Sequence, residues 1–79
     1  MDPSDRLRSC FIETFELAPD VDVEALHYQG IDGWDSVGHM KLIAALETTF
    51  DIIIDTQDVL DMNSFNMAKE ILRKHDVSI

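Results

Sequence analysis

DGWDSVGHM, residues 32–40, is the stretch in which a loop gives way to a helix. Its Asp-Gly pair favours a tight turn, and the apolar spacing that follows predicts a helix over residues 37–50. Ser36 lies at the join, where its side-chain oxygen can cap the first helical turn. The same position suits a phosphodiester, because unpaired amides and the positive end of the helix dipole favour a phosphate there. The residue pattern by itself leaves both interpretations of Ser36 open.

The chain is short and strongly acidic. Its 79 residues are enough for a single domain, residues 1–79, with a small core. A net charge of −10 argues against nucleic acid and anionic membrane surfaces, and it favours basic surfaces on partner proteins. No stretch approaches the roughly 18 apolar residues that a membrane span needs, and no signal peptide is evident. We therefore expect a cytoplasmic, monomeric protein.

A first amphipathic helix is predicted over residues 4–17. Ser4 is its candidate cap, and Pro19 disfavours helical geometry in the residue before it. The single cysteine excludes an internal disulfide and fits a small core residue. The apolar stripe of this helix comprises Leu7, Cys10, Phe11, Thr14 and Phe15.

A long loop, residues 19–35, follows this helix. Apolar residues recur in it every two to five positions, which predicts a loop pinned to the core, with a short turn near residues 23–27 and bends at Gly30 and Gly33. The pattern Asp20-x-Asp22-x-Glu24 resembles the start of a calcium loop. Alanine follows where such a loop requires glycine, and the bidentate glutamate is missing. We predict no metal site.

The helix over residues 37–50 has two apolar faces. One is expected to contact the core and comprises His39, Leu42, Ile43, Leu46 and Phe50. The other is rotated by about half a turn and comprises Val37, Met40, Lys41, Ala44 and Thr48. A thin domain has nothing of its own to cover this second face, which suits a partner, although isolated surface apolar residues are also ordinary.

Two further helices complete the predicted fold. A short one runs from Asp55 or Thr56 to about Asp61, with Val59 and Leu60 as its buried residues. The last is capped by Ser64 or Asn63 and precedes a frayed tail, residues 76–79; its apolar stripe comprises Phe65, Ala68, Ile71 and Leu72. The sequence thus predicts an all-α four-helix bundle with three longer helices, a short third helix and a long structured loop between the first two.

Several motifs resemble acyl carrier proteins across essentially the whole chain. Asp35-Ser36-Val37 resembles the family's Asp-Ser-Leu attachment signature, LETTFDI (residues 46–52) resembles its acidic helix end, and Ser64-Phe65 resembles the start of its last helix. The resemblance implies that a phosphopantetheinyl transferase attaches 4′-phosphopantetheine from coenzyme A to Ser36. The terminal thiol then carries an acyl group as a thioester, and the domain itself catalyses nothing.

The resemblance also implies where cargo and partners bind. An acyl chain can enter the bundle in this family, and Leu46, Val59 and Ala68 are positioned to line such a cavity, although a plain packed core explains the same residues. The implied partners are the acyl-loading enzyme and enzymes of the acyltransferase or ketosynthase type. The residues expected to contact them are Asp35, Val37, Met40, Lys41, Ala44, Glu47 and Ile54.

The departures from the family pattern bear on the pathway. Gly38, Lys41 and Thr48 stand on a face that carries several acids in carriers of primary fatty-acid synthesis, which favours polyketide or other specialised acyl biosynthesis. A peptidyl or aminoacyl carrier is an alternative, but its motif reads Gly-Gly-His-Ser or Gly-Gly-Asp-Ser where this chain has Trp34 before Asp35.

Two other function classes are weighed against a carrier. An unmodified acidic helical interaction module would use the exposed apolar face alone. An enzyme is disfavoured because His27, His39 and His75 have no evident nucleophile, acid or metal-ligand spacing around them. His39 lies on the core-facing stripe and is expected to be a packed, hydrogen-bonded histidine.

Overall fold

The first helix, α1 (Pro3–Phe15), begins one residue earlier and ends two residues earlier than the predicted helix over residues 4–17, because Glu16 ends it in a left-handed conformation. The computed structural model describes residues 2–79, so Met1 of the predicted domain lies outside it. Asp2 caps α1 by accepting the Asp5 N–H at 2.9 Å, and Pro3 fits the first helical position, so the prediction of Ser4 as the cap is wrong. Leu7, Cys10 and Phe11 are buried as predicted.

The long loop is pinned to the core as its sequence predicts. Val23 and Trp34 are buried, and a 3-10 turn, η1 (Val23–Ala25), lies where the short turn was expected. The left-handed backbone conformation in this loop belongs to Gln29, with φ of 65°, and neither Gly30 nor Gly33 has a positive φ. Glycine is therefore not needed at these two bends for backbone conformation.

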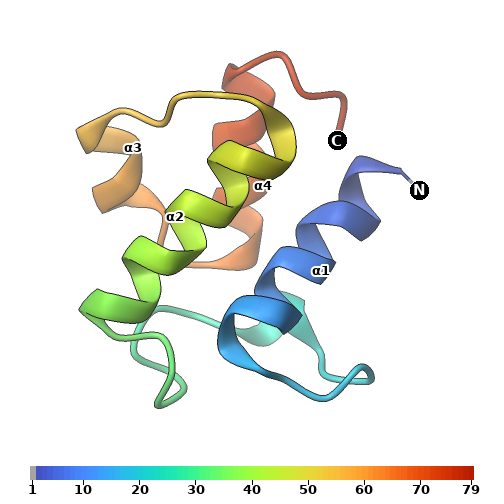
Figure 1. Ribbon diagram of the computed structural model, residues 1–79, viewed down its shortest axis with the longest axis vertical. Coiled ribbons are helices and arrows are strands. Elements are labelled where there is room, and N and C mark those ends of the chain that lie inside the picture. Colours follow the sequence, from blue (N-terminus) through green and yellow to red (C-terminus); the bar gives the residue numbers. More distant parts are fainter. Residues whose placement is uncertain (1) are drawn as a thin grey trace.

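The central helix, α2 (Ser36–Phe50), presents the two faces expected of it. Leu42, Ile43 and Leu46 are buried, and His39 and Phe50 are half-buried on the same side. The residues of the second face are all exposed: Val37, Met40, Lys41, Ala44 and Thr48. In Figure 1, α2 crosses the front of the molecule between α1 and α3, with α4 behind it.

The last two helices are α3 (Thr56–Asp61), capped by Asp55, and α4 (Phe65–Lys74), capped by Ser64. The α4 stripe is buried as predicted: Phe65, Ala68, Ile71 and Leu72. The predicted bounds and Asp55 cap of α3 are confirmed, and Val59 is half-buried against the core. The prediction that Leu60 is buried is wrong, because Leu60 is 72% exposed, whereas Asp58 is buried. The tail folds back, and Val77 and Ile79 pack against the core instead of fraying.

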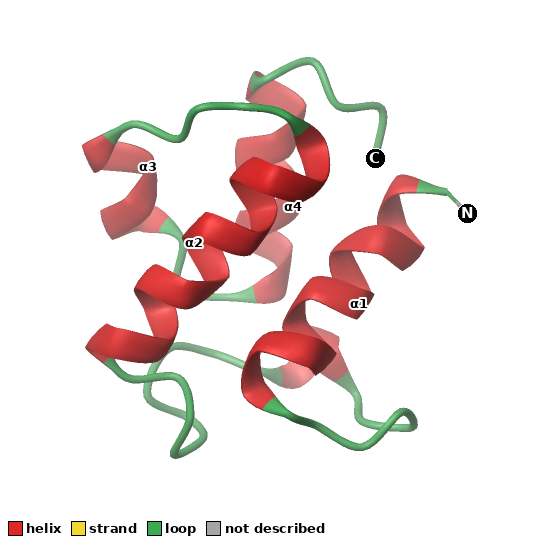
Figure 2. Ribbon diagram, in the orientation of Figure 1, coloured by secondary structure: helices red, strands yellow, loops and turns green. Residues whose placement is uncertain are grey.

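Within residues 2–79 the regular structure is helical, with four α-helices, one 3-10 turn and no strand (Figure 2). An isolated backbone bridge between His27 and Ser64 joins the long loop to the start of α4. In this part of the chain, no helix is both long enough and apolar enough to cross a membrane.

Candidate functional site

The junction between the long loop and α2 is built on Trp34. Its side chain is fully buried, stacks on Phe15 with ring centroids 5.3 Å apart, and meets Phe11 edge-to-face at 5.4 Å. Backbone bonds hold the loop around it, because Trp34 N–H donates to Ile31 O and Gln29 N–H donates to Trp34 O. The buried indole thereby fixes where the next residues, Asp35 and Ser36, leave the core.

Asp35, and not Ser36, caps α2. Its carboxylate accepts the Gly38 N–H at 2.8 Å, and its backbone is extended. Ser36 is consequently the first residue of the helix, and its side chain is exposed. Of the two interpretations that the sequence leaves open for Ser36, the cap is therefore wrong, and the hydroxyl satisfies no helix amide.

Gly38 explains how the loop can approach the helix so closely. A Cβ at this position would lie 1.9 Å from the carbonyl oxygen of Gly33, well inside any allowed contact. Gly38 is buried by this contact. Glycine lowers the helix propensity of this turn, but its lack of a side chain allows the loop to pack tightly beside Ser36.

The Ser36 hydroxyl faces Tyr28 of the long loop, with Ser36 Oγ 3.3 Å from the Tyr28 hydroxyl oxygen. Tyr28 is one of the recurring apolar residues from which the sequence predicts a pinned loop, and no partner was predicted for its hydroxyl. The signal available was the residue type, since a partly buried tyrosine usually directs its hydroxyl to a polar partner. The fold, which brings residues eight positions apart together across the loop, was needed to identify that partner.

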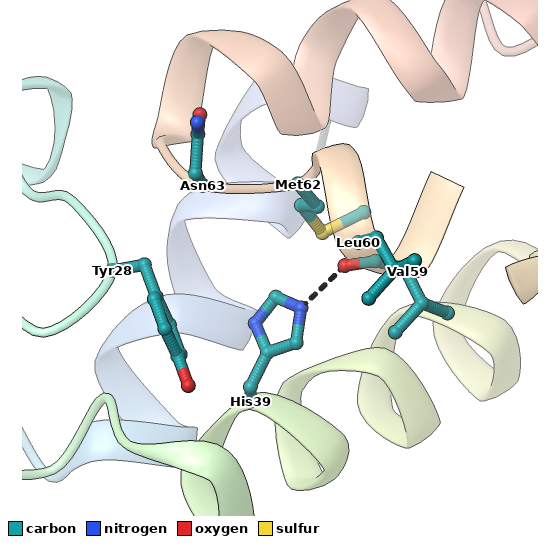
Figure 3. A pocket seen from close by; sticks show the side chains of 6 residues that line it. All are labelled: Tyr28, His39, Val59, Leu60, Met62 and Asn63. Carbon is teal, nitrogen blue, oxygen red and sulfur yellow. Dashed lines mark hydrogen bonds between the residues drawn. The ribbon is translucent and has the colours of Figure 1, made fainter. Parts of the chain in front are cut away.

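A pocket of about 140 Å³ lies beside Tyr28 (Figure 3), lined by Tyr28, His39, Val59, Leu60, Met62 and Asn63. His39 is held on both sides of its ring: Trp34 Nε1–H donates to His39 Nδ1 at 2.9 Å, and His39 Nε2 lies 2.7 Å from Val59 O. Because Nδ1 accepts, Nε2 carries the proton and donates to Val59 O. His39 is thus the packed, hydrogen-bonded histidine that the sequence predicted.

The residues expected to line an acyl cavity are only partly at this pocket. Val59 lines it. Leu46 and Ala68 are fully buried, and neither lines the pocket. Their burial fits the alternative of a plain packed core, and Tyr28 and Met62 are lining residues that the sequence did not indicate.

The predicted partner residues divide into exposed and engaged groups. Val37 is 65% and Met40 56% exposed, and Asp35, Lys41 and Ala44 are exposed as well. Glu47 is half-buried, and its carboxylate accepts the Ile54 N–H at 2.9 Å. Ile54 is buried, so little of its side chain is accessible to the partners that it was expected to contact. Ile53 and Leu60 are the large apolar side chains exposed nearby in the chain.

Cys10 and Asp58 are titratable residues away from this junction, and both make hydrogen bonds within the fold. Burial raises the pKa of the Cys10 thiol, which also donates to Thr49 Oγ1. Asp58 accepts a hydrogen bond from Lys74 Nζ at 2.6 Å, and this contact holds the pKa of the Asp58 carboxyl below its usual value. Across residues 2–79 no group of three or more His, Cys, Asp or Glu side chains is arranged to hold a metal ion.

The sequence matches no protein-family model, and no curated protein or solved structure provides a match. The function of this chain is therefore inferred from the geometry around Ser36.

Proposed function

We propose that this chain is an acyl carrier protein that holds an acyl group as a thioester on 4′-phosphopantetheine attached to Ser36. The observation that carries the proposal is the position of Ser36: its hydroxyl is exposed at the first position of α2, while the neighbouring Asp35 caps the helix. A serine that satisfies no helix amide is available for esterification. The positive end of a helix 15 residues long favours the phosphate that would result.

The arrangement of the helices also supports a carrier. Three longer helices, a short α3 and a long ordered loop before α2 are what the proposed four-helix bundle of a carrier would contain. The pocket is lined mostly by apolar side chains and by Tyr28, whose hydroxyl faces Ser36. We infer that an attached arm lies over this pocket. The prosthetic group would supply a flexible thiol, and the residues of this chain would supply its anchor and a surface for partners.

The net charge and the exposed face of α2 support the choice of partners. A chain of net charge −10 attracts basic surfaces, and the exposed Val37 and Met40 lie one and four residues from Ser36. A phosphopantetheinyl transferase, an acyl-loading enzyme and acyltransferase- or ketosynthase-type enzymes are the proposed partners. Lys41 and the scarcity of acids on this face favour polyketide or other specialised acyl biosynthesis.

Intact-mass measurement tests the proposal. The protein, incubated with coenzyme A and a broad-specificity phosphopantetheinyl transferase, is expected to gain the mass of one phosphopantetheine. Ser36→Ala is expected to gain nothing, whereas the matched control Ser78→Ala, in the exposed tail, gains the same mass as the wild type. An unchanged wild-type mass would refute the carrier function. Mass analysis of the arm released from native protein distinguishes an acyl from an aminoacyl or peptidyl cargo.

A second candidate function is an unmodified interaction module. The exposed Val37, Met40, Ile53 and Leu60 favour it, since large apolar side chains on a small domain mark contact surfaces. This function predicts partner binding that Ser36→Ala leaves unchanged and that Met40→Glu weakens. Loss of partner binding on Ser36→Ala would exclude the unmodified interaction module.

A further inference from the structure

Tyr28 is held rigidly beside Ser36. Its backbone N–H donates to Asn63 O at 2.8 Å, which ties this part of the loop to the segment between α3 and α4. Its ring meets His39 and Trp34 edge-to-face, with centroids 5.4 and 6.4 Å away, and Figure 3 shows the ring lying alongside His39. Trp34 and His39 are in turn joined by the hydrogen bond from Trp34 Nε1–H to His39 Nδ1. The phenol oxygen therefore has a fixed position.

The direction of the Tyr28–Ser36 hydrogen bond follows from the chemistry of the two hydroxyls. A phenol O–H is a stronger donor than an alkyl O–H, because the ring delocalises the charge that develops on oxygen. Either hydroxyl could donate across the 3.3 Å separation, and this difference in donor strength favours donation from Tyr28 to Ser36 Oγ. In this arrangement the Ser36 proton remains free to leave, and the side chain is restrained among its three staggered rotamers.

We propose that Tyr28 is a positioning residue for the modification of Ser36, an inference that rests on the proposed carrier function. In that reaction, Ser36 Oγ forms a bond to the phosphorus that carries the pantetheine arm of coenzyme A. The bond from that phosphorus to the bridging pyrophosphate oxygen breaks, and 3′,5′-ADP leaves with the electron pair. The Ser36 proton passes to a base of the transferase. Tyr28 holds Oγ in one rotamer facing solvent, so that less rotational freedom is lost between the bound complex and the transition state.

Steady-state kinetics of the modification test this role. Tyr28→Phe removes the hydroxyl and keeps the ring that packs on Trp34 and His39. We expect kcat to fall about 3- to 10-fold, the effect of one hydrogen bond, with KM for the carrier unchanged. The matched control Ser78→Ala removes an exposed hydroxyl from the tail, away from α2, and is expected to behave as the wild type. Tyr28→para-aminophenylalanine restores a donor and is expected to recover most of the lost rate.

The outcomes separate this inference from the carrier function. A wild type that gains no phosphopantetheine overturns the carrier function and this inference with it. Equal kcat values for wild type and Tyr28→Phe overturn the positioning role alone. A slower Tyr28→Phe that the para-amino variant does not rescue, or whose circular dichroism departs from that of the wild type, also overturns it, because the loss then comes from packing.

Discussion

Asp35 and Ser36 have separate roles at the start of α2, and their alanine variants should differ in stability. Asp35→Ala removes the acceptor of the Gly38 N–H and is expected to lower the free energy of unfolding by about 1 kcal/mol. Ser36→Ala removes a hydroxyl that caps nothing and should change stability by less than about 0.5 kcal/mol. Urea unfolding followed by circular dichroism measures both. A larger loss for Ser36→Ala than for Asp35→Ala would contradict this division.

Gly38 is the residue at which the smallest change should have a large effect. Gly38→Ala raises helix propensity but places a methyl group against the Gly33 carbonyl, so the loop must move. We expect a net loss of about 1–3 kcal/mol in unfolding free energy, as for overpacking elsewhere. The control is Ala44→Gly on the exposed face of α2, which should cost about 1 kcal/mol through propensity alone. A more stable Gly38→Ala variant would show that the loop yields freely.

At the residue scale, the sequence predicted the buried faces of the longer helices more accurately than it predicted the residues that cap the helices. Three of the four helices are capped by aspartate, at Asp2, Asp35 and Asp55. Serine and aspartate cap helices about equally well, so where the two stand close together the pattern could not choose between them. The buried stripes of α1, α2 and α4 followed from spacing alone, because each of these helices has enough turns to define a face.

The element that the sequence described least well is α3. Six residues make less than two turns, so spacing could not fix which side faces inward, and Leu60 was assigned to the core although it is exposed. Two polar contacts tie α3 to other helices: Val59 O accepts from His39, and Asp58 accepts from Lys74 at the end of α4. Contacts between residues 16 or 20 positions apart in different elements leave no periodic signal in a sequence.

The contact between Asp58 and Lys74 predicts how the attachment of α3 depends on pH. The pKa of Asp58 is lowered in the fold from its ordinary 3.8, mainly by the hydrogen bond from Lys74. A carboxyl with a lowered pKa stabilises the fold above its ordinary pKa, and this contribution is lost as the pH falls through the folded pKa. We expect Asp58→Asn to lower the urea midpoint at pH 7 and to approach the wild type as the pH falls below 3.8 and through the folded pKa.

Urea midpoints between pH 7 and pH 2 measure this difference. Asp20→Asn, an exposed acid in the long loop, is the control and should not change the pH dependence. A midpoint difference between Asp58→Asn and the wild type that stays constant down to pH 2 would mean that the ionised carboxylate contributes nothing.

At the scale of the whole molecule, the net charge should govern how fast partners are met. Sixteen acidic residues against six Lys and Arg favour fast encounter with basic surfaces, and salt should slow it. Glu47→Gln removes one charge and keeps an acceptor for the Ile54 N–H, whereas Glu47→Lys also loses that bond. We expect both variants to slow association with a basic transferase, and only Glu47→Lys to lower stability clearly.

Stopped-flow association at low and high salt checks this prediction, with thermal unfolding alongside. Equal association rates for wild type and Glu47→Gln at low salt would contradict the role of this charge.

The all-helical class and the charge were predictable because both depend on the whole sequence at once. The Tyr28–Ser36 contact was not, because it depends on how a loop without regular structure packs.

The burial of Trp34 gives the molecule a built-in optical probe. The chain has one tryptophan, so its intrinsic fluorescence comes from a single indole that is fully shielded from water and stacked near the His39 ring. Its emission should be blue-shifted in the folded protein and move to longer wavelength when the junction before Ser36 loosens. Any loosening of this junction, including one that accompanies the proposed modification of Ser36, is therefore expected to be visible in real time without a dye.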